Sequence, residues 1–258
     1  MKKIWVGTSW KMNKDAQSAK EWVSSVLPHL QLCSDGVQPF VIPPFPYLSQ
    51  VSQLLNQQPI KVGAQNICWQ DEGAYTGEVS PLMVKDCGGS IVEIGHSERR
   101  AQFGETDHTV NLKVLAALRN DLTPLVCVGD SKEEKAWGVS IESVVRQVII
   151  ALYQVPSHRL TEVLIAYEPI WAIGEHGVPA TKEEAQQVHQ AIRQAIQERY
   201  GEATADQMVL LYGGSVNLSN ASSLLDQKDI DGVFVGRTAW QAEGYAELLN
   251  IANAKVKG

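Results

Sequence analysis

The feature of this sequence that most constrains its fold is a regular alternation of short apolar runs with longer amphipathic stretches. Eight short runs read as buried strands: Ile4–Thr8, Pro39–Ile42, Lys61–Ala64, Ile91–Ile94, Pro124–Val128, Val163–Tyr167, Met208–Tyr212 and Gly232–Val235. Between them, apolar residues recur at helical spacing in Asp15–Leu30, Thr109–Leu118, Ser140–Leu152, Thr181–Tyr200, Leu218–Leu225 and Thr238–Ala254. Strands that alternate with helices pair in parallel through right-handed crossovers. Eight such units with no surplus predict an α/β fold, a closed (β/α)8 barrel of parallel strands ringed by helices.

Length and composition agree with one domain of this kind. The chain has 258 residues, of which 44% are hydrophobic and 20% charged, as in an ordinary globular protein. Barrels of alternating strands and helices often reach this length as one domain. No linker or low-complexity segment divides the chain, so we expect a single barrel domain over residues 1–258. Thr181 and Glu184 have the spacing of a capping box, which predicts a helix that starts there and ends at Gly201.

Charge and residue spacing argue against several classes of function. The net charge of −7 offers no basic footprint for nucleic acid, although a few cations and backbone N–H groups can still bind a small anion. No GxGxxG motif follows the first expected strand, which weakens a dinucleotide-binding interpretation. We expect no metal, because neither the cysteines nor the histidines have ligand spacing: Cys33, Cys68, Cys87, Cys127, His29, His96, His108, His158, His176 and His189.

The sequence also indicates the cellular compartment. The N-terminal segment reaches Gly7, Ser9 and Lys11 before an apolar signal core is formed. No run of 18 apolar residues occurs, so we expect no membrane span. We therefore expect a protein of the reducing cytoplasm.

Unusual polar residues follow five of the eight expected strands. Lys11 follows the first, His96 and Glu98 follow the fourth, and Glu168 follows the sixth, which Pro169 terminates. Glycine-containing segments follow the seventh and eighth: Gly213-Gly214-Ser215 and Gly236-Arg237. The carboxyl ends of the strands of a closed barrel lie on one face, so these residues converge there. A carboxylate in that position is a candidate general base.

Each of these features has a simpler explanation when it stands alone. Glu168 and Lys11 could be solvated surface residues, and His96 could cap or pack against a helix. The pair Gly213–Gly214 could form a plain turn. Their joint occurrence at the matching ends of five strands is much harder to obtain by accident.

Four ordered motifs resemble those of the triosephosphate isomerase family. Gly7–Asn13 (GTSWKMN) is similar to the family's GGNWKMN, and Gly95–Arg100 matches GHSERR. Ala166–Gly174 (AYEPIWAIG) is similar to AYEPVWAIG, and Tyr212–Val216 matches YGGSV. The resemblance extends along essentially the whole chain and implies the TIM barrel that the strand pattern predicts.

The resemblance implies proton transfer without a cofactor. Glu168 would take a proton from the carbon next to a carbonyl and return it to the adjacent carbon. His96 would polarise the carbonyl and move a proton between the two oxygens, and the N-terminus of an expected short helix at Ser97–Ala101 would keep it neutral. Lys11 would hold the phosphate and stabilise the enediolate oxygen. Glu98 would support the site by pairing with Lys11 or with a backbone donor.

The resemblance also implies the position of the phosphate and of a partner. Backbone N–H groups near Gly174, Ser215 and Gly236 would surround the phosphate of a small phosphorylated sugar, with Gly214 beside them. Closure of Pro169–Thr181 would exclude water and protect the enediolate. A homodimer is expected through the loop around Tyr75-Thr76-Gly77, which would reach into the site of a second subunit.

Three departures from the family pattern touch parts that would contact substrate. Ser9 stands where the family has an asparagine that binds substrate, and Arg237 replaces the second glycine of a Gly-Gly phosphate loop. The lid, residues 172–180, is one residue longer than the usual AIGTGKTA. These features favour a paralogue of the family that converts L-erythrulose 1-phosphate to D-erythrulose 4-phosphate. The alternative is the glycolytic isomerase, which interconverts dihydroxyacetone phosphate and D-glyceraldehyde 3-phosphate.

Two interpretations from other classes remain open at this point. A phosphate-binding or scaffold protein that keeps the fold but lacks activity would be consistent with Ser9 and Arg237. A metal-dependent aldolase on the same kind of barrel is disfavoured by the histidine spacing. Turnover of a sugar phosphate excludes the first, and activity that survives chelation excludes the second.

Overall fold

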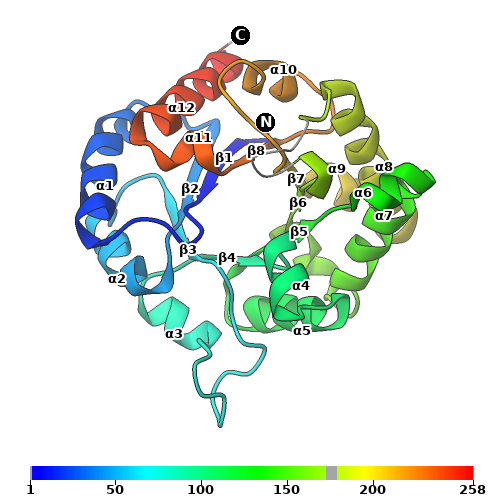
Figure 1. Ribbon diagram of the computed structural model, residues 1–258, viewed down its shortest axis with the longest axis horizontal. Helices are drawn as coiled ribbons and strands as arrows, with labels where there is room; N and C mark the ends of the chain where they lie inside the picture. The colour runs from blue at the N-terminus through cyan, green and yellow to red at the C-terminus, as the bar shows by residue number, and fades with distance from the viewer. Residues whose placement is uncertain (1, 173–178, 258) are drawn as a thin grey trace.

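The computed structural model describes residues 2–172 and 179–257, and its strands form one closed parallel barrel in chain order, as the sequence predicted (Figure 1). The barrel closes because β1 pairs with both β2 and β8. The strand bounds lie close to the expected runs: β1 Ile4–Ser9, β2 Val37–Ile42, β3 Lys61–Ala64, β4 Ile91–Ile94, β5 Thr123–Val128, β6 Leu164–Tyr167, β7 Val209–Tyr212 and β8 Gly232–Val235.

Helices form a ring around the barrel, which Figure 1 shows from one end of its axis. The part of the chain before residue 152 contributes α1 Ala16–Gln31, α2 Phe45–Leu54, α3 Pro81–Asp86, α4 Ser97–Phe103, α5 Asp107–Arg119, α6 Lys132–Trp137 and α7 Ser140–Ala151. The rest contributes η1 Ser157–Glu162, η2 Ile170–Ala172, α8 Lys182–Tyr200, α9 Glu202–Gln207, α10 Ala221–Leu225, α11 Arg237–Trp240 and α12 Ala242–Lys257. The predicted capping box opens α8, since Thr181 accepts from the Glu184 N–H and Glu184 accepts from the Thr181 N–H.

The C-terminal helix differs from its prediction. One helix was expected over Thr238–Ala254, but the structure has α11 and α12 with an extended residue, Gln241, between them. Tertiary contacts explain the break. The Trp240 indole donates to the Ser9 carbonyl (2.9 Å), and its own carbonyl accepts from Lys14 Nζ (2.7 Å). These bonds tie the end of α11 to the end of β1, so the chain turns there despite its helical periodicity.

Two apolar layers lie on opposite sides of the strands. Side chains that point toward the barrel axis form one cluster, which includes Phe40, Ile91 and Leu125, and those that point outward pack under the helices. Successive side chains of a strand alternate between these sides. On β4, Val92 and Ile94 belong to the outer layer and Ile91 to the inner one. Glu93 therefore faces the barrel interior.

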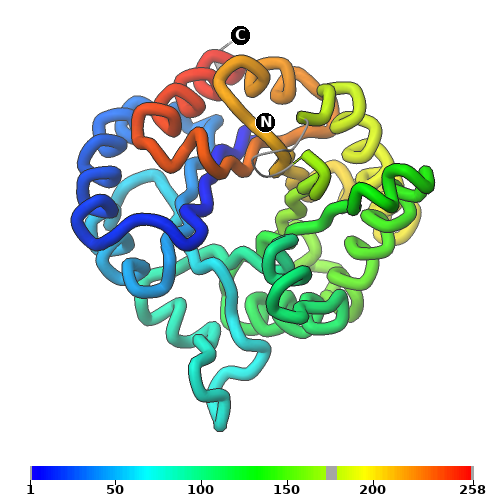
Figure 2. The backbone as a smooth tube through the Cα atoms, in the orientation of Figure 1, coloured from blue at the N-terminus to red at the C-terminus, as the bar shows by residue number. Residues whose placement is uncertain are grey.

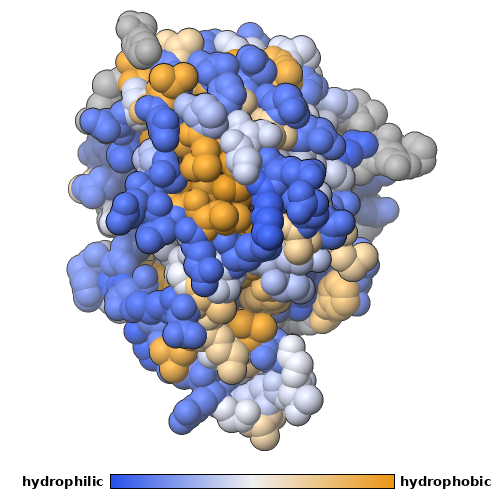
Figure 3. Space-filling model, turned by 90° about the vertical axis from the view of Figure 1, so that its left-hand side faces the viewer, coloured by the Kyte–Doolittle hydropathy of each residue, from blue (hydrophilic) through white to orange (hydrophobic). Residues whose placement is uncertain are grey.

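The surface of the molecule is mainly hydrophilic on the face shown in Figure 3 and carries one projecting segment. Across residues 2–172 and 179–257, no helix combines the length and apolar character needed to span a bilayer. The face shown in Figure 3 is mainly hydrophilic, with one hydrophobic area near its centre. The segment between β3 and α3 projects away from the barrel (Figure 2), and every residue from 72 to 78 in it is exposed.

Candidate active site

A cavity of about 470 Å³ opens at the carboxyl ends of the strands, and the predicted site residues line it. This volume is in the range of small-molecule sites. All predicted site residues that the structure describes belong to the lining: Ser9, Lys11, His96, Glu98, Glu168, Gly214, Ser215, Gly236 and Arg237. Gly174 lies outside the described residues, as does most of the expected lid. The barrel thus brings together residues that are up to 228 positions apart, from Ser9 to Arg237.

Lys11 extends from the turn that follows β1. Its backbone is in the left-handed region (φ 53°), which costs a non-glycine residue about 1–3 kcal/mol. The Gln65 side chain, which the sequence analysis did not identify, supports this turn by donating to the Lys11 carbonyl (2.9 Å). Lys11 Nζ donates to Glu98 Oε1 at 2.7 Å, as expected. Burial opposes the charge of Lys11, but its hydrogen bond to Glu98 and the charge of Glu168 outweigh the burial and raise the pKa of Lys11. Lys11 therefore stays cationic.

His96 caps the N-terminus of the predicted short helix, α4, and is 5% exposed. Its Nδ1 accepts a hydrogen bond from the Glu98 backbone N–H at 3.1 Å. A ring nitrogen that accepts is unprotonated, so the proton of the neutral ring resides on Nε2. Nε2 lies 3.6 Å from Glu168 Oε2. The ring therefore presents a neutral N–H donor on the side of Glu168.

Glu168 follows β6 directly and is only 3% exposed. Its Oε2 is buried and has no hydrogen-bond partner among the described residues. A buried carboxylate oxygen without a partner costs free energy, so it is typical of a group that waits for a ligand. Gly213 makes room for this side chain, since a Cβ there would lie 2.8 Å from Glu168 Cγ.

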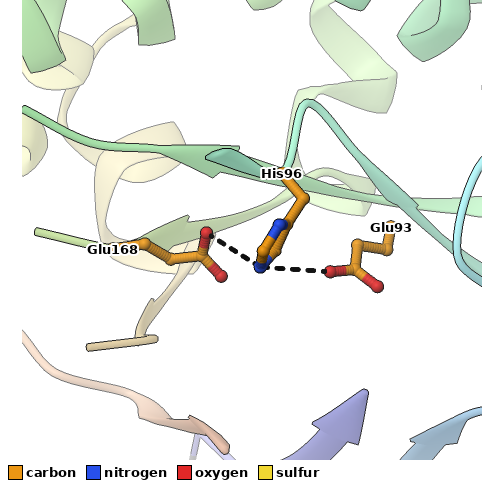
Figure 4. A group of neighbouring side chains, drawn as sticks. All are labelled: Glu93, His96 and Glu168. Carbon is orange, nitrogen blue, oxygen red and sulfur yellow. Dashed lines mark ion pairs between the residues drawn. The ribbon is translucent and has the colours of Figure 1, made fainter. Parts of the chain in front are cut away.

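The structure adds Glu93, which sequence reasoning missed. It faces the barrel interior from β4, is 2% exposed, and accepts a hydrogen bond from Ser9 Oγ at 2.8 Å. Burial, together with the nearby charge of Glu168, raises the pKa of Glu93 to about 7. Its Oε1 lies 4.0 Å from His96 Nε2, so the imidazole stands between two carboxyl groups (Figure 4). A charged residue within the apolar run Ile91–Ile94 is the sequence signal that could have identified it.

The segments after β7 and β8 form the opposite part of the cavity. Gly214 has to be a glycine, because a Cβ there would lie 2.4 Å from the Tyr212 hydroxyl oxygen. The Ser215 carbonyl accepts from Asn220 Nδ2 at 2.9 Å, which fixes this turn. Arg237 is exposed and begins α11 directly after Gly236. Backbone amides and a guanidinium group thus border this end of the cavity, which suits an anion.

The cluster formed by Glu93, His96 and Glu168 has the donor atoms of a possible metal site. Glu93, His96 and Glu168 each offer a ligand atom, and these atoms lie within 4.8 Å of one another. A histidine and two carboxylates could ligate a small divalent cation. Their spacing along the sequence gave no sign of this, because the fold, and not a local motif, brings them together.

The segment after Glu168 is fastened to the barrel through Asp130, which is fully buried. The Asp130 carboxylate accepts from the Tyr167 hydroxyl (2.9 Å), the Trp171 indole (2.9 Å) and the Ser140 hydroxyl (2.6 Å). Tyr167, which precedes Glu168, and Trp171 in the segment after it are therefore held by one acceptor.

The geometry has a defined chemical capability. A buried carboxylate with an unpaired oxygen, a neutral imidazole that donates and a cationic ammonium border one cavity. Such a set can remove a proton next to a carbonyl and stabilise the enediolate that results.

The chain is similar to known proteins over nearly its whole length. The family model described as Triosephosphate isomerase matches residues 4–252. Relatives named L-erythrulose-1-phosphate isomerase include one from Mesorhizobium japonicum, 46% identical over 253 residues and covering 98% of each chain. One from Brucella abortus is 44% identical over 260 residues, which cover 100% of this chain and 99% of the relative. One from Mycolicibacterium smegmatis is 46% identical over 256 residues, which cover 98% and 95%.

Proposed function

Because this chain belongs to the triosephosphate isomerase family and is an isomerase, we propose that it converts L-erythrulose 1-phosphate to D-erythrulose 4-phosphate through an enediolate, without a cofactor. The observation that carries the proposal is the unpaired Glu168 Oε2 at 3.6 Å from the donor nitrogen of His96, in a cavity that Lys11 also lines. The names of the relatives support the four-carbon substrate.

The proposed reaction moves one carbonyl group along the chain. Glu168 removes the proton from the hydroxyl-bearing carbon next to the ketone, and the carbonyl oxygen becomes an enediolate oxygen. His96 Nε2–H donates to this oxygen, and Lys11 offsets its charge. A proton then passes between the two oxygens through His96, and Glu168 returns the carbon-bound proton to the neighbouring carbon. No atom is gained or lost, so no co-reactant is needed.

The substrate phosphate is proposed to lie at the ends of β7 and β8, near Ser215, Gly214, Gly236 and Arg237. The exposed guanidinium of Arg237 and the adjoining backbone amides support this position, because both attract an anion. Gly174 completes the phosphate site in this proposal.

The test compares kcat/KM for L-erythrulose 1-phosphate and dihydroxyacetone phosphate, with deuterium incorporation from D2O followed by NMR. We expect deuterium on the carbon that receives the proton, a higher kcat/KM for the four-carbon ketose, and rates unchanged by a chelator. A higher kcat/KM for dihydroxyacetone phosphate would indicate the three-carbon reaction. Absence of exchange with both compounds would refute isomerisation by proton transfer.

We further propose a homodimer formed through the loop around Tyr75-Thr76-Gly77. The exposed, projecting segment 72–78 supports this, together with Met12, whose side chain is 96% exposed next to Lys11. Light scattering should give twice the mass of one chain, and Thr76→Glu should shift it toward the monomer. A wild-type mass equal to one chain would refute the dimer. Residues 1–258 are proposed to act as one domain in the cytoplasm.

A further inference from the structure

A hydroxyl group that lines the cavity, on Ser9, and a carboxyl group directly behind it, on Glu93, are not used by the proposed proton transfer. Ser9 Oγ donates to Glu93 Oε2 at 2.8 Å, and the two residues are 4% and 2% exposed. A carboxyl group buried in an apolar strand lowers stability unless it is compensated. Only one of its oxygens accepts a hydrogen bond from the described residues. The buried Glu93 carboxyl group costs free energy and lies beside His96, so we infer that it binds a ligand.

The topology gives the direction in which a substrate would reach it. The strands follow one another around the closed barrel in chain order, so β4 stands across the axis from β8 (Figure 1). Glu168 after β6 and Lys11 after β1 lie between these two sides. A sugar phosphate with its phosphate at the ends of β7 and β8 therefore passes Glu168 and extends toward β4. The end of the carbon chain arrives at Glu93.

The atoms of this cluster leave room for a substrate oxygen. His96 Nε2 is 4.0 Å from Glu93 Oε1 and 3.6 Å from Glu168 Oε2, and the cluster's ligand atoms lie within 4.8 Å of one another. A substrate hydroxyl oxygen about 2.8 Å from His96 Nε2 can lie at the same distance from Glu93 Oε1, because these two atoms are only 4.0 Å apart. Within the described chain, neither Glu93 Oε1 nor Glu168 Oε2 already receives such a bond. The site is therefore built to accept hydroxyl groups from the substrate.

We propose that Glu93, oriented by Ser9, binds the terminal hydroxyl group of a four-carbon ketose phosphate and so sets the preference for four carbons over three. This inference rests on the proposed function. In dihydroxyacetone phosphate the chain ends at the carbon that loses its proton, whereas the four-carbon ketose carries a CH2OH group beyond it. Ser9 is shorter than the asparagine of the family motif, and it leaves space for that group while it holds Glu93 in place.

The test is a cycle of two substrates and two enzymes. The substrates are L-erythrulose 1-phosphate and the analogue in which the terminal CH2OH is a methyl group. The enzymes are the wild type and Glu93→Ile, which keeps a similar volume without an acceptor. In the wild type we expect loss of the hydroxyl group to lower kcat/KM about 10- to 100-fold, the effect of a hydrogen bond to a carboxyl group. In Glu93→Ile the two substrates should differ less than threefold, about 0.6 kcal/mol.

Two further measurements keep the outcome interpretable. Glu93→Gln retains an acceptor, so it should keep most of the discrimination. Glu93→Leu, which also lacks an acceptor, replaces Glu93→Ile if that variant does not fold by circular dichroism. Dihydroxyacetone phosphate should lose far less kcat/KM in Glu93→Ile than L-erythrulose 1-phosphate does. If all substrates lose activity equally, Glu93 acts only through His96 and the inference is wrong. If the wild type prefers dihydroxyacetone phosphate, the proposed function fails first, and the inference fails with it.

Discussion

Two of the charged side-chain clusters among the described residues are built in opposite ways. In the first, Glu105 accepts from both Lys113 Nζ and Arg99 Nε, and Lys113 Nζ also donates to the Asn66 side chain. Each oxygen of the Glu105 carboxylate therefore accepts from a cation. In the second, Glu93 and Glu168 face one neutral imidazole, and Glu168 Oε2 has no partner among the described residues.

The difference separates charges that hold the fold from charges that are proposed to perform chemistry. A buried carboxylate with two cationic partners is compensated, and it is inert because its lone pairs are occupied. Two carboxyl groups around an imidazole are not compensated, and the free energy they cost becomes available when a substrate supplies the missing hydrogen bonds. The clusters should therefore respond to substitution in different observables, stability for the first and turnover for the second.

The largest effect is expected for Glu168→Gln. The amide keeps the shape of the side chain but cannot accept the carbon-bound proton, so kcat should fall by about 10²–10⁴-fold or more. The free energy of unfolding should not fall, since one negative charge leaves a cluster that holds two acids. Steady-state rates and urea unfolding measure the two quantities. A variant that loses stability and retains turnover would place Glu168 with the structural cluster.

Lys113→Met should have the reverse signature. It leaves Glu105 with one of its two cations, and breaking a buried ion pair costs about 3–5 kcal/mol of stability. Lys182→Met is the matched control, because the Lys182–Glu183 pair is exposed and long at 3.8 Å and contributes little. Among folded molecules kcat should stay at the wild-type value for both variants. A drop in kcat at constant stability would mean that the first cluster also supports catalysis.

The sequence predicted the barrel, and it predicted His96 and Glu168 of the second cluster. Both predictions depend on the periodicity of the apolar residues. Alternating runs define strands and helices, and a strand's end locates Lys11, His96 and Glu168, so the active face follows from the order of elements. Glu93 was missed because a four-residue run with three apolar members reads as fully buried. The positions of Ile91 and Glu93 on the same side of β4 become meaningful only once the strand is known to have an interior face.

Other parts depend on contacts that no local pattern contains. The break between α11 and α12 comes from hydrogen bonds of Trp240 to the other end of the chain, and the sequence predicted one helix there. The helices α2 and α3 are short and begin with a proline near their first turn, so they were not predicted. The support that Gln65 gives to the strained Lys11 turn joins two loops that sequence does not relate.

The pH dependence of stability offers a smaller test of the second cluster. Because the pKa of Glu93 is raised from 4.5 to about 7, the unfolded chain ionises first as the pH rises. The stability that its protonated form provides is complete below pH 4.5 and is lost as the pH rises toward 7, by about 3 kcal/mol. Glu93→Gln should remove this loss, so its advantage over the wild type should grow between pH 5 and pH 8. Parallel pH profiles from urea unfolding would contradict the raised pKa.

The smallest effect concerns Asp130, a buried acid that is saturated with neutral donors instead of cations. Trp171→Phe removes the indole donor at 2.9 Å but keeps the aromatic ring beneath Lys135, whose Nζ lies 3.2 Å from the ring centroid. Asp130 Oδ2 retains the Ser140 hydroxyl, so the loss should be about 1–2 kcal/mol. Trp137→Phe is the control, because Trp137 is 73% exposed and should change the midpoint of thermal unfolding by less than Trp171→Phe does. Equal midpoints for the two variants would show that the indole bond contributes nothing, and that the hydroxyl groups of Tyr167 and Ser140 alone compensate the acid.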